Sequence, residues 1–122
     1  MILVDTSVWI DHLRRSNARL VALLEQNEVV IHPFVVGEIA CGNLANREII
    51  LQLLHQLPPA TLADVDEILG YLSSRRLYGK GIGYIDVHLL ASATIDGTQL
   101  WTRDRRLGVI AREQGCASRD VE

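Results

Sequence analysis

Four carboxylates stand at positions where an acidic side chain is unusual. Asp5 directly follows the apolar run at 2–4, and Asp104 comes just past "QLWT". Glu38 is set in "FVVGEIAC" and Asp86 in "GYIDVHLLASA", each with apolar residues one helical turn away. A charge among apolar neighbours is costly unless something pairs with it. These four side chains are therefore the first candidates for chemistry.

Each carboxylate also has a purely structural explanation. Asp5, or Thr6 beside it, could cap the helix that begins near residue 7, and Asp104 could cap the helix after it or sit in a turn. Glu38 could point to water from a helix edge, since buried glutamates are rare. Asp86 could be a first-turn acid that the helix dipole favours. No single position decides between the two explanations.

Taken together, the four acids favour a metal site. Carboxylates brought close to one another repel unless some of them bind a proton or a divalent cation neutralises them. All the ligands would be hard oxygens, which select Mg²⁺ or Mn²⁺ rather than zinc. The four histidines show no zinc-type spacing, and we expect each to be an ordinary surface or core-edge residue.

Arginines supply the second part of the chemistry. Lys80 is the only lysine, and the arginines occur in clusters. A guanidinium suits phosphate better than an ammonium does, although such clusters are often only solvated helix ends. A carboxylate-bound Mg²⁺ or Mn²⁺ beside arginines can catalyse the hydrolysis of a phosphodiester. The candidates for substrate phosphates are Arg14, Arg15, Arg75, Arg76, Arg103 and Arg105.

Short strand-like runs alternate with helical patterns along the chain. Strands are expected at 2–4, 29–31 and 99–101, with weaker signals at 60–62 and 116–118. Helices are expected at 7–15, 17–26, 34–44, 47–57, 63–77, 84–96 and 105–115. This alternation predicts a parallel sheet covered on both faces, whose ligands lie outside the carboxyl ends of the strands. Asp5 and Asp104 would then face the same rim.

The helix expected at 84–96 has an apolar side and a polar side. Successive residues of a helix turn by about 100°. Asp86 then shares a face with Leu89 and Leu90, whereas His88 and Ser92 lie on the polar side. Asp86 is therefore expected to project from the apolar face.

Length and composition limit the class of protein. The chain has 122 residues, 48% of them hydrophobic, which predicts a single domain over 1–122 with its own core. The net charge of −3 argues against passive, charge-driven binding to nucleic acid. Cys41 and Cys116 fit no disulfide or zinc framework. With no signal-peptide pattern and no apolar run of ~20 residues, we expect a cytoplasmic protein without a membrane span.

Four motifs in this order resemble one family. "LVDTSVWID", "VVGEIACG", "YIDVHLLASA" and "LWTRDRRL" are similar to the PIN domain, and most closely to the VapC-type ribonuclease toxins of prokaryotic toxin–antitoxin pairs. The resemblance places the family's acidic quartet on Asp5, Glu38, Asp86 and Asp104. It places the supporting hydroxyls, which would orient carboxylates or water, on Ser7 and Thr102.

The resemblance also implies a fold and an activity. The fold would be a three-layer α/β/α sandwich with a central parallel sheet. The activity would be that of a Mg²⁺- or Mn²⁺-dependent endoribonuclease toxin, whose metal-activated water leaves a 5′-phosphate and a 3′-hydroxyl. The resemblance also implies three partners: an RNA substrate, a second copy in a homodimer, and a cognate VapB-like antitoxin, whose acidic groups are an alternative target for the arginines. Leu107 departs from the aromatic residue of many relatives, which we expect to affect packing alone.

Two other classes of protein compete with this hypothesis. A receiver domain needs a second acid beside the first-strand aspartate and a late lysine, yet Thr6 follows Asp5 and Lys80 is the only lysine. A non-catalytic α/β binding module that sequesters a partner would keep the fold, and metal-dependent cleavage of RNA separates it from an enzyme. Trp9 and Trp101 could belong either to a dimer patch or to the core.

Overall fold

A small parallel sheet forms the centre of the molecule. The computed structural model describes residues 1–119. Strands β1 (Ile2–Val4), β2 (Val29–Val30) and β3 (Gln99–Trp101) are parallel and lie in the order β2-β1-β3. The first strand of the chain is therefore the central one, and its carboxyl end lies between those of its neighbours.

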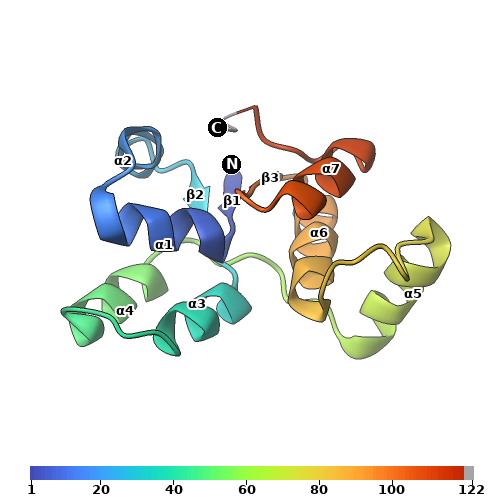
Figure 1. The fold of residues 1–122 in the computed structure, drawn as a ribbon, viewed down its shortest axis with the longest axis horizontal. Coiled ribbons are helices and arrows are strands. Elements are labelled where there is room, and N and C mark those ends of the chain that lie inside the picture. The colour runs from blue at the N-terminus through green and yellow to red at the C-terminus, as the bar shows by residue number, and fades with distance from the viewer. Residues whose placement is uncertain (120–122) are drawn as a thin grey trace.

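Helices cover the sheet on both sides. In Figure 1, α1 to α4 lie on one side of the strands and α5 to α7 on the other. This arrangement confirms the predicted α/β fold. The helices are α1 (Thr6–Arg15), α2 (Ala18–Glu25), α3 (Pro33–Ala40), α4 (Arg47–His55), α5 (Val65–Arg75), α6 (Tyr84–Asp96) and α7 (Arg105–Glu113).

The weaker strand signals correspond to single bridges. Ile31 pairs with Pro59, and Leu100 pairs with Ala117, both in parallel. The predicted strand at 29–31 is correspondingly one residue shorter, and no extended strand forms at 60–62 or 116–118. The Ile31 N–H donates to the Pro58 carbonyl at 2.9 Å and the Ala60 N–H donates to the Ile31 carbonyl at 2.8 Å. The next donors along this ladder would be Pro58 in one direction and Pro33 in the other, and neither has an N–H, so the pairing stops there.

Local sequence signals account for the helix boundaries. α5 begins with a capping box in which Asp64 Oδ1 accepts from the Glu67 N–H at 2.8 Å and Glu67 Oε1 accepts from the Asp64 N–H at 3.0 Å. α3 has Pro33 in its first turn, where the missing N–H costs nothing. α6 ends at Gly97, whose φ of 68° suits glycine.

The core contains β1 and both tryptophans. Leu3 and Val4 are completely buried, and Trp9 and Trp101 are 4% and 1% exposed. The tryptophans therefore belong to the core rather than to an exposed dimer patch. Leu107 is also completely buried, in keeping with a role in packing.

The expectation that α6 has an exposed polar side is wrong. Every residue from Val87 to Ala93 is buried, including His88 and Ser92. The Ser92 hydroxyl donates to the Thr61 carbonyl at 2.6 Å, which satisfies it without water. α6 packs against both α5 and β3, so its middle is covered all round and its small polar residues are core residues.

Within residues 1–119, the structure contains no helix that is long and apolar enough to cross a membrane.

We predict that Leu3→Ala lowers the free energy of unfolding by about 3 kcal/mol, because it leaves a cavity in the central strand. Leu69→Ala is the matched control, since Leu69 is 53% exposed, and it should change stability by less than about 0.5 kcal/mol. Urea unfolding measures both. Equal losses would contradict the assignment of β1 to the core.

Candidate functional site

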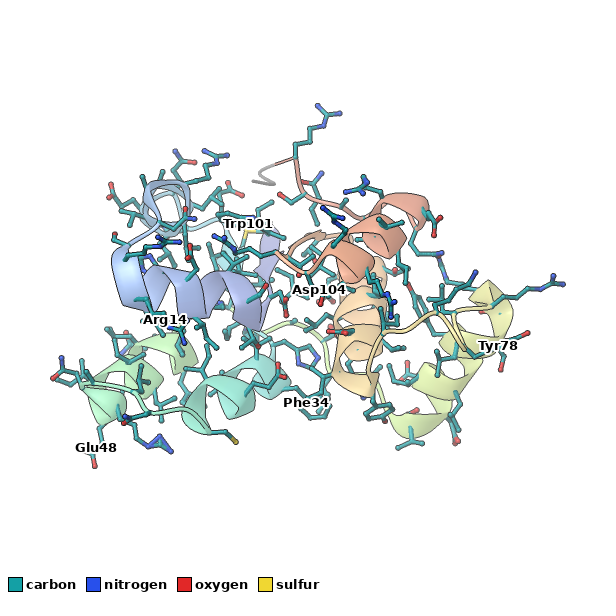
Figure 2. The ribbon with its side chains drawn as sticks, in the orientation of Figure 1. Arg14, Phe34, Glu48, Tyr78, Trp101 and Asp104 are labelled. Atoms are coloured by element: carbon teal, nitrogen blue, oxygen red, sulfur yellow. The ribbon has the colours of Figure 1, made fainter. Side chains whose placement is uncertain are left out.

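The four acids come from four different elements that meet at one rim of the sheet. Asp5 ends β1 and precedes α1, and Asp104 follows β3 and precedes α7. Glu38 lies in α3, and Asp86 lies in the first turn of α6. Figure 2 shows Asp104 in the middle of the molecule, between α1 and α6. The predicted grouping at the carboxyl ends of β1 and β3 is thus present.

Asp5 is held by two hydroxyl groups. Its side chain is 7% exposed, and Ser7 Oγ and Thr102 Oγ1 each donate to its Oδ2 at 2.7 Å. Although Asp5 occupies the N-cap position of α1, it makes no capping hydrogen bond. Its other oxygen, Oδ1, accepts no hydrogen bond from the described residues. The capping explanation therefore fails for Asp5, and one of its oxygens stays available.

The same two hydroxyls also fix the loop that carries Asp104. The Arg103 N–H donates to Ser7 Oγ at 3.0 Å, and the Asp104 N–H donates to Thr102 Oγ1 at 3.0 Å. Asp104 Oδ1 accepts from the Leu107 N–H at 2.9 Å, so Asp104 does cap α7. For Asp104 the capping explanation is correct, and it leaves Oδ2 for another contact.

Glu38 has a partner that the sequence did not reveal. Thr6 Oγ1 donates to Glu38 Oε1 at 2.6 Å, which joins α1 to α3 at the rim. Glu38 is exposed, as its structural alternative expected. The position of Thr6 directly after Asp5 could have predicted this contact, because the first residue of a helix that follows a strand-end acid lies at the same rim of the sheet.

The charges of the other three acids act on the carboxylate of Asp86. Its carboxylate accepts from the Gly83 N–H at 3.1 Å. Burial raises the pKa of Asp86 above its ordinary value of 3.8, and the charges of Asp5, Asp104 and Glu38 raise that pKa further, against the effect of the Gly83 hydrogen bond. The repulsion expected from the sequence is therefore present in the structure.

The glycine-rich loop before α6 lies against an arginine. Gly81 has a φ of 79°, a conformation that favours glycine, and the Arg106 guanidinium lies next to it. Arg106 follows Asp104 by two residues, so the start of α7 lies close to the segment that leads into Asp86.

A divalent cation fits these residues in donor type, charge and access. All four side chains offer carboxylate oxygens, and the free oxygens of Asp5 and Asp104 are available. Within the described part of the chain, no group of three acidic, histidine or cysteine side chains is placed so that it could hold an ion. The donor set selects a hard divalent ion.

The candidate arginines divide into two groups. Two of the arginines share one acid: Arg103 donates to Asp11 Oδ2 at 2.8 Å, and Arg15 Nε lies 3.4 Å from Asp11 Oδ1. The i,i+4 spacing of Asp11 and Arg15 was the only sequence signal for this role of Asp11. Asp11 thus contacts two cations, of which Arg103 directly precedes Asp104. Arg14 lines a cavity beside α1, and Arg105 is exposed at the start of α7.

Arg75 and Arg76 lie elsewhere. Both belong to the end of α5, at the edge of the molecule in Figure 1. Arg75 donates to Gln114 Oε1 at 2.9 Å, and its guanidinium lies 4.8 Å from the centre of the Tyr71 ring. These contacts tie α5 to the end of α7, so the structure does not bring this pair to the acidic rim.

Two histidines are more buried than expected. His32 is completely buried and His88 is 2% exposed, with ring centres 5.9 Å apart. Burial, with a smaller effect of His88, lowers the pKa of His32 to about 4, and burial also lowers the pKa of His88. His32 Nδ1 accepts from the Phe34 N–H at 3.0 Å and so caps α3, the helix of Glu38. The expectation of surface or core-edge histidines is wrong for these two.

Comparison with known proteins identifies the family. The PIN domain family profile matches residues 2–113. The chain is 48% identical over 118 residues to Ribonuclease VapC32 of Mycobacterium tuberculosis (strain ATCC 25618 / H37Rv), covering 96% of this chain and 95% of the relative. This chain belongs to the PIN-domain family, and within it to the VapC-type ribonucleases. The same protein of strain CDC 1551 matches equally well.

Solved structures agree with the PIN fold. The crystal structure of FitAcB from Neisseria gonorrhoeae matches with a TM-score of 0.64 and 25% identity, over 92% of this chain and 94% of that one. FitAB bound to an IR36 DNA fragment matches with a TM-score of 0.62 and 21% identity, over 100% of this chain and 94% of that one. The parallel sheet and the helices on both its sides are therefore those of a PIN domain. A single domain over 1–122 stays a prediction.

We predict that Thr102→Val lowers the free energy of unfolding by about 1–3 kcal/mol, because it removes one of two donors to a buried carboxylate. Thr98→Val is the matched control: Thr98 is 8% exposed and its hydroxyl has no partner, so the change should be neutral or stabilising. Chemical denaturation compares the two variants. A harmless Thr102→Val would contradict the role given to this hydroxyl.

We also predict that Asp86→Asn raises the unfolding midpoint at pH 7 in buffer with EDTA. The pKa of Asp86 is raised in the folded state, so its favourable contribution is present at low pH and lost as the pH rises through that value. Asparagine keeps an acceptor for Gly83 and carries no charge. The gain should vanish below about pH 4, where aspartate is neutral in the unfolded state as well. Glu25→Gln, an exposed control, should change little, and a destabilised Asp86→Asn would contradict the repulsion.

Proposed function

We propose that the acidic rim is the active site of this VapC-type endoribonuclease, and that its four carboxylates hold a divalent metal ion. The observation that carries the proposal is the arrangement around Asp5, whose Oδ2 is held by two hydroxyls while Asp86 is influenced by the charges of the other three acids. A site that gathers four acids without cationic partners of equal number calls for a cation.

Each side chain then has a role. Asp5 and Asp86 are the main ligands, with Asp104 and Glu38 binding directly or through water. Ser7 and Thr102 keep Asp5 oriented, and Thr6 does the same for Glu38. The bound ion would activate a water molecule and screen the charge of the scissile phosphate. Mg²⁺ and Mn²⁺ both suit this all-oxygen set.

Arginines would hold the substrate. Asp11 keeps Arg103 and Arg15 beside the rim, where their guanidinium groups can meet phosphates that flank the cut. Cleavage would leave a 5′-phosphate and a 3′-hydroxyl, as in the family it belongs to. The residue that protonates the leaving oxygen has no candidate among the groups described above.

The partners follow from the same assignment. The substrate is RNA, and a VapB-like antitoxin neutralises the toxin in the cytoplasm, where both would be made. A homodimer is part of the proposal. Exposed apolar side chains that a second copy could cover lie on two helices: Ile49 and Leu53 on α4, and Val65 and Leu69 on α5.

We predict that Asp5→Asn abolishes cleavage of RNA and that EDTA does the same to the unaltered protein. Loss of a direct ligand should exceed the roughly 100-fold loss that follows mutation of a residue supporting a ligand. The measurement uses partner-free protein, structured RNA, and buffers with Mg²⁺, with Mn²⁺ or with EDTA.

Glu25→Gln serves as the control for removing one negative charge far from the rim, and it should keep full activity. Cleavage that resists EDTA, or that survives Asp5→Asn, would overturn the metal mechanism. A protein that binds RNA and never cleaves it, with any metal, would favour the non-catalytic binding module instead.

A further inference from the structure

Two aromatic side chains stand at the surface beside the two helical acids. Phe34 lies one turn before Glu38 on α3, and Tyr84 lies two residues before Asp86 at the start of α6. Tyr84 is 50% exposed, and Phe34 is partly exposed. We propose that these two rings, called the aromatic platform below, stack against an unpaired base of the RNA next to the cut, and that Arg106 binds the phosphate of that nucleotide. The inference rests on the proposed nuclease function.

The two rings of the platform share a buried neighbour. The His88 side chain is 2% exposed, and its ring centre lies 4.6 Å from that of Phe34 and 4.7 Å from that of Tyr84. The interplanar angles are 70° and 84°, so both are edge-to-face contacts, a geometry in which aromatic rings attract each other. His88 therefore joins a ring of α3 to a ring of α6 in one cluster.

His32 supports the platform from the core. Its Nδ1 accepts from the Phe34 N–H at 3.0 Å, and its ring centre lies 5.2 Å from that of Phe34. Among the described residues, His32 Nε2 and both ring nitrogens of His88 are buried without a hydrogen-bond partner. An unpaired buried nitrogen costs free energy, so an aliphatic core would be cheaper at these positions. The cluster is therefore built for more than packing, and it holds two partly exposed rings in fixed positions.

A cation stands beside the platform. The loop at 78–83 leads into Tyr84, and the Arg106 guanidinium, from the first turn of α7, lies next to Gly81 of that loop. Arg106 is exposed, and over residues 1–119 it forms no ion pair. A guanidinium without an acidic partner is a phosphate ligand. Proteins that bind single strands combine these two features, because aromatic rings take the bases and cations take the backbone.

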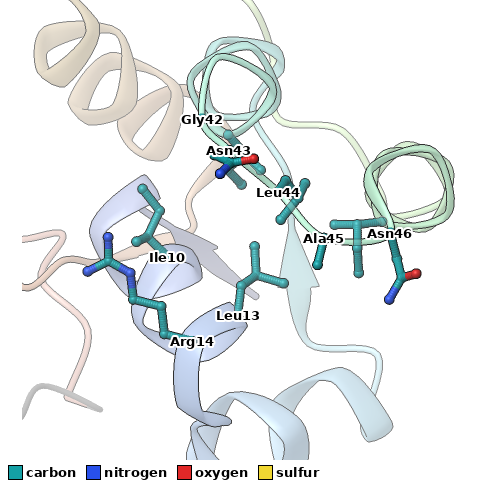
Figure 3. A pocket seen from close by; sticks show the side chains of 10 residues that line it. Ile10, Leu13, Arg14, Gly42, Asn43, Leu44, Ala45 and Asn46 are labelled. Atoms are coloured by element: carbon teal, nitrogen blue, oxygen red, sulfur yellow. The ribbon is translucent and has the colours of Figure 1, made fainter.

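The surroundings favour RNA over the other candidate occupant, an apolar surface of a second copy or of the antitoxin. Glu38, Asp86 and Arg106 border the platform, and a protein interface would have to bury or pair these charges. An RNA strand brings a phosphate for Arg106 and a base for the rings, which is how unpaired bases are recognised. The cavity beside α1 (Figure 3) has no aromatic ring among the residues that line it, so it offers no such stacking surface.

The test measures the binding of labelled single-stranded RNA by fluorescence anisotropy in the Asp5→Asn background, with a gel to show that the RNA stays intact. Tyr84→Ala should weaken binding about tenfold, the loss of one base stacked on an aromatic ring, whereas Tyr84→Phe keeps the ring and should bind like the parent. Tyr78→Ala is the matched control and should have no effect, because Tyr78 is 65% exposed and lies beside α5 at the edge of the molecule in Figure 2.

The salt dependence of binding tests the phosphate contact separately. Arg106→Gln should weaken binding and reduce the salt slope by about 0.7, the loss of one phosphate contact on a single strand. Tyr84→Ala should leave that slope unchanged, because it removes no charge. Arg112→Gln, an equal charge change at an exposed position in the last turn of α7, should leave both the affinity and the slope near the parent values.

An oligonucleotide without bases separates stacking from a general effect on the structure. The parent should bind this ribose-phosphate chain more weakly than intact RNA, and Tyr84→Ala should bind it as the parent does. Phe34→Leu keeps an apolar side chain but loses a ring, so it should weaken the binding of intact RNA only.

Two kinds of result overturn the proposal. One is parent-like binding of intact RNA by both Tyr84→Ala and Phe34→Leu, or an equal loss for the intact and the base-free chains. The other is unchanged RNA binding by variants that alter the sedimentation of a homodimer or lose inhibition by the antitoxin, because the platform would then belong to a protein interface.

Failure here differs from failure of the proposed function. Metal-independent cleavage, or cleavage by Asp5→Asn, would remove the metal mechanism whatever Tyr84→Ala does. Metal-dependent cleavage together with parent-like RNA binding by Tyr84→Ala and Arg106→Gln would leave the active site in place and remove only the aromatic platform as a nucleotide site.

Discussion

The position of the Asp5 carboxylate is the constraint on which the rest of the site depends. Asp5 stands at the carboxyl end of the central strand, where parallel strands of a PIN domain open onto one rim. Ser7 and Thr102 hold its Oδ2, and through their other contacts they fix the backbone at 103 and 104. The same two hydroxyls thus fix the positions of both strand-end acids, Asp5 and Asp104. The helical acids reach the same rim from α3 and α6, and the charges of the acids together raise the pKa of Asp86.

The fold and the acidic quartet were largely predictable from the sequence. Alternating strands and helices require crossovers, so the parallel sheet followed from order alone, and acids in apolar settings pointed to the rim. Sequence could not decide whether Asp5 and Asp104 were caps or ligands, because both roles place an acid between a strand and a helix. The structure separates them: Asp104 caps α7 with one oxygen, and Asp5 caps nothing.

Other features depend on tertiary contacts that no local pattern encodes. His88 and Ser92 looked like the polar side of a helix, yet α6 is covered on all sides and both are buried. Asp11 forms an ion pair with Arg103, which is 92 residues away in the sequence. Arg75 donates a hydrogen bond to Gln114 and does not lie at the acidic rim. Arginine clusters that look alike in the sequence therefore serve different purposes. Arg14, by contrast, lines a cavity beside α1.

The proposed activity depends on the binding of a divalent ion by the acidic quartet. An anomalous difference map from crystals of the partner-free protein soaked in Mn²⁺ tests it most directly, because it locates the ion without relying on activity. We expect a peak among the carboxylates of Asp5, Glu38, Asp86 and Asp104, and none in crystals of Asp5→Asn. A peak that persists in Asp5→Asn, or a fully soaked crystal with no peak at this rim, would contradict it.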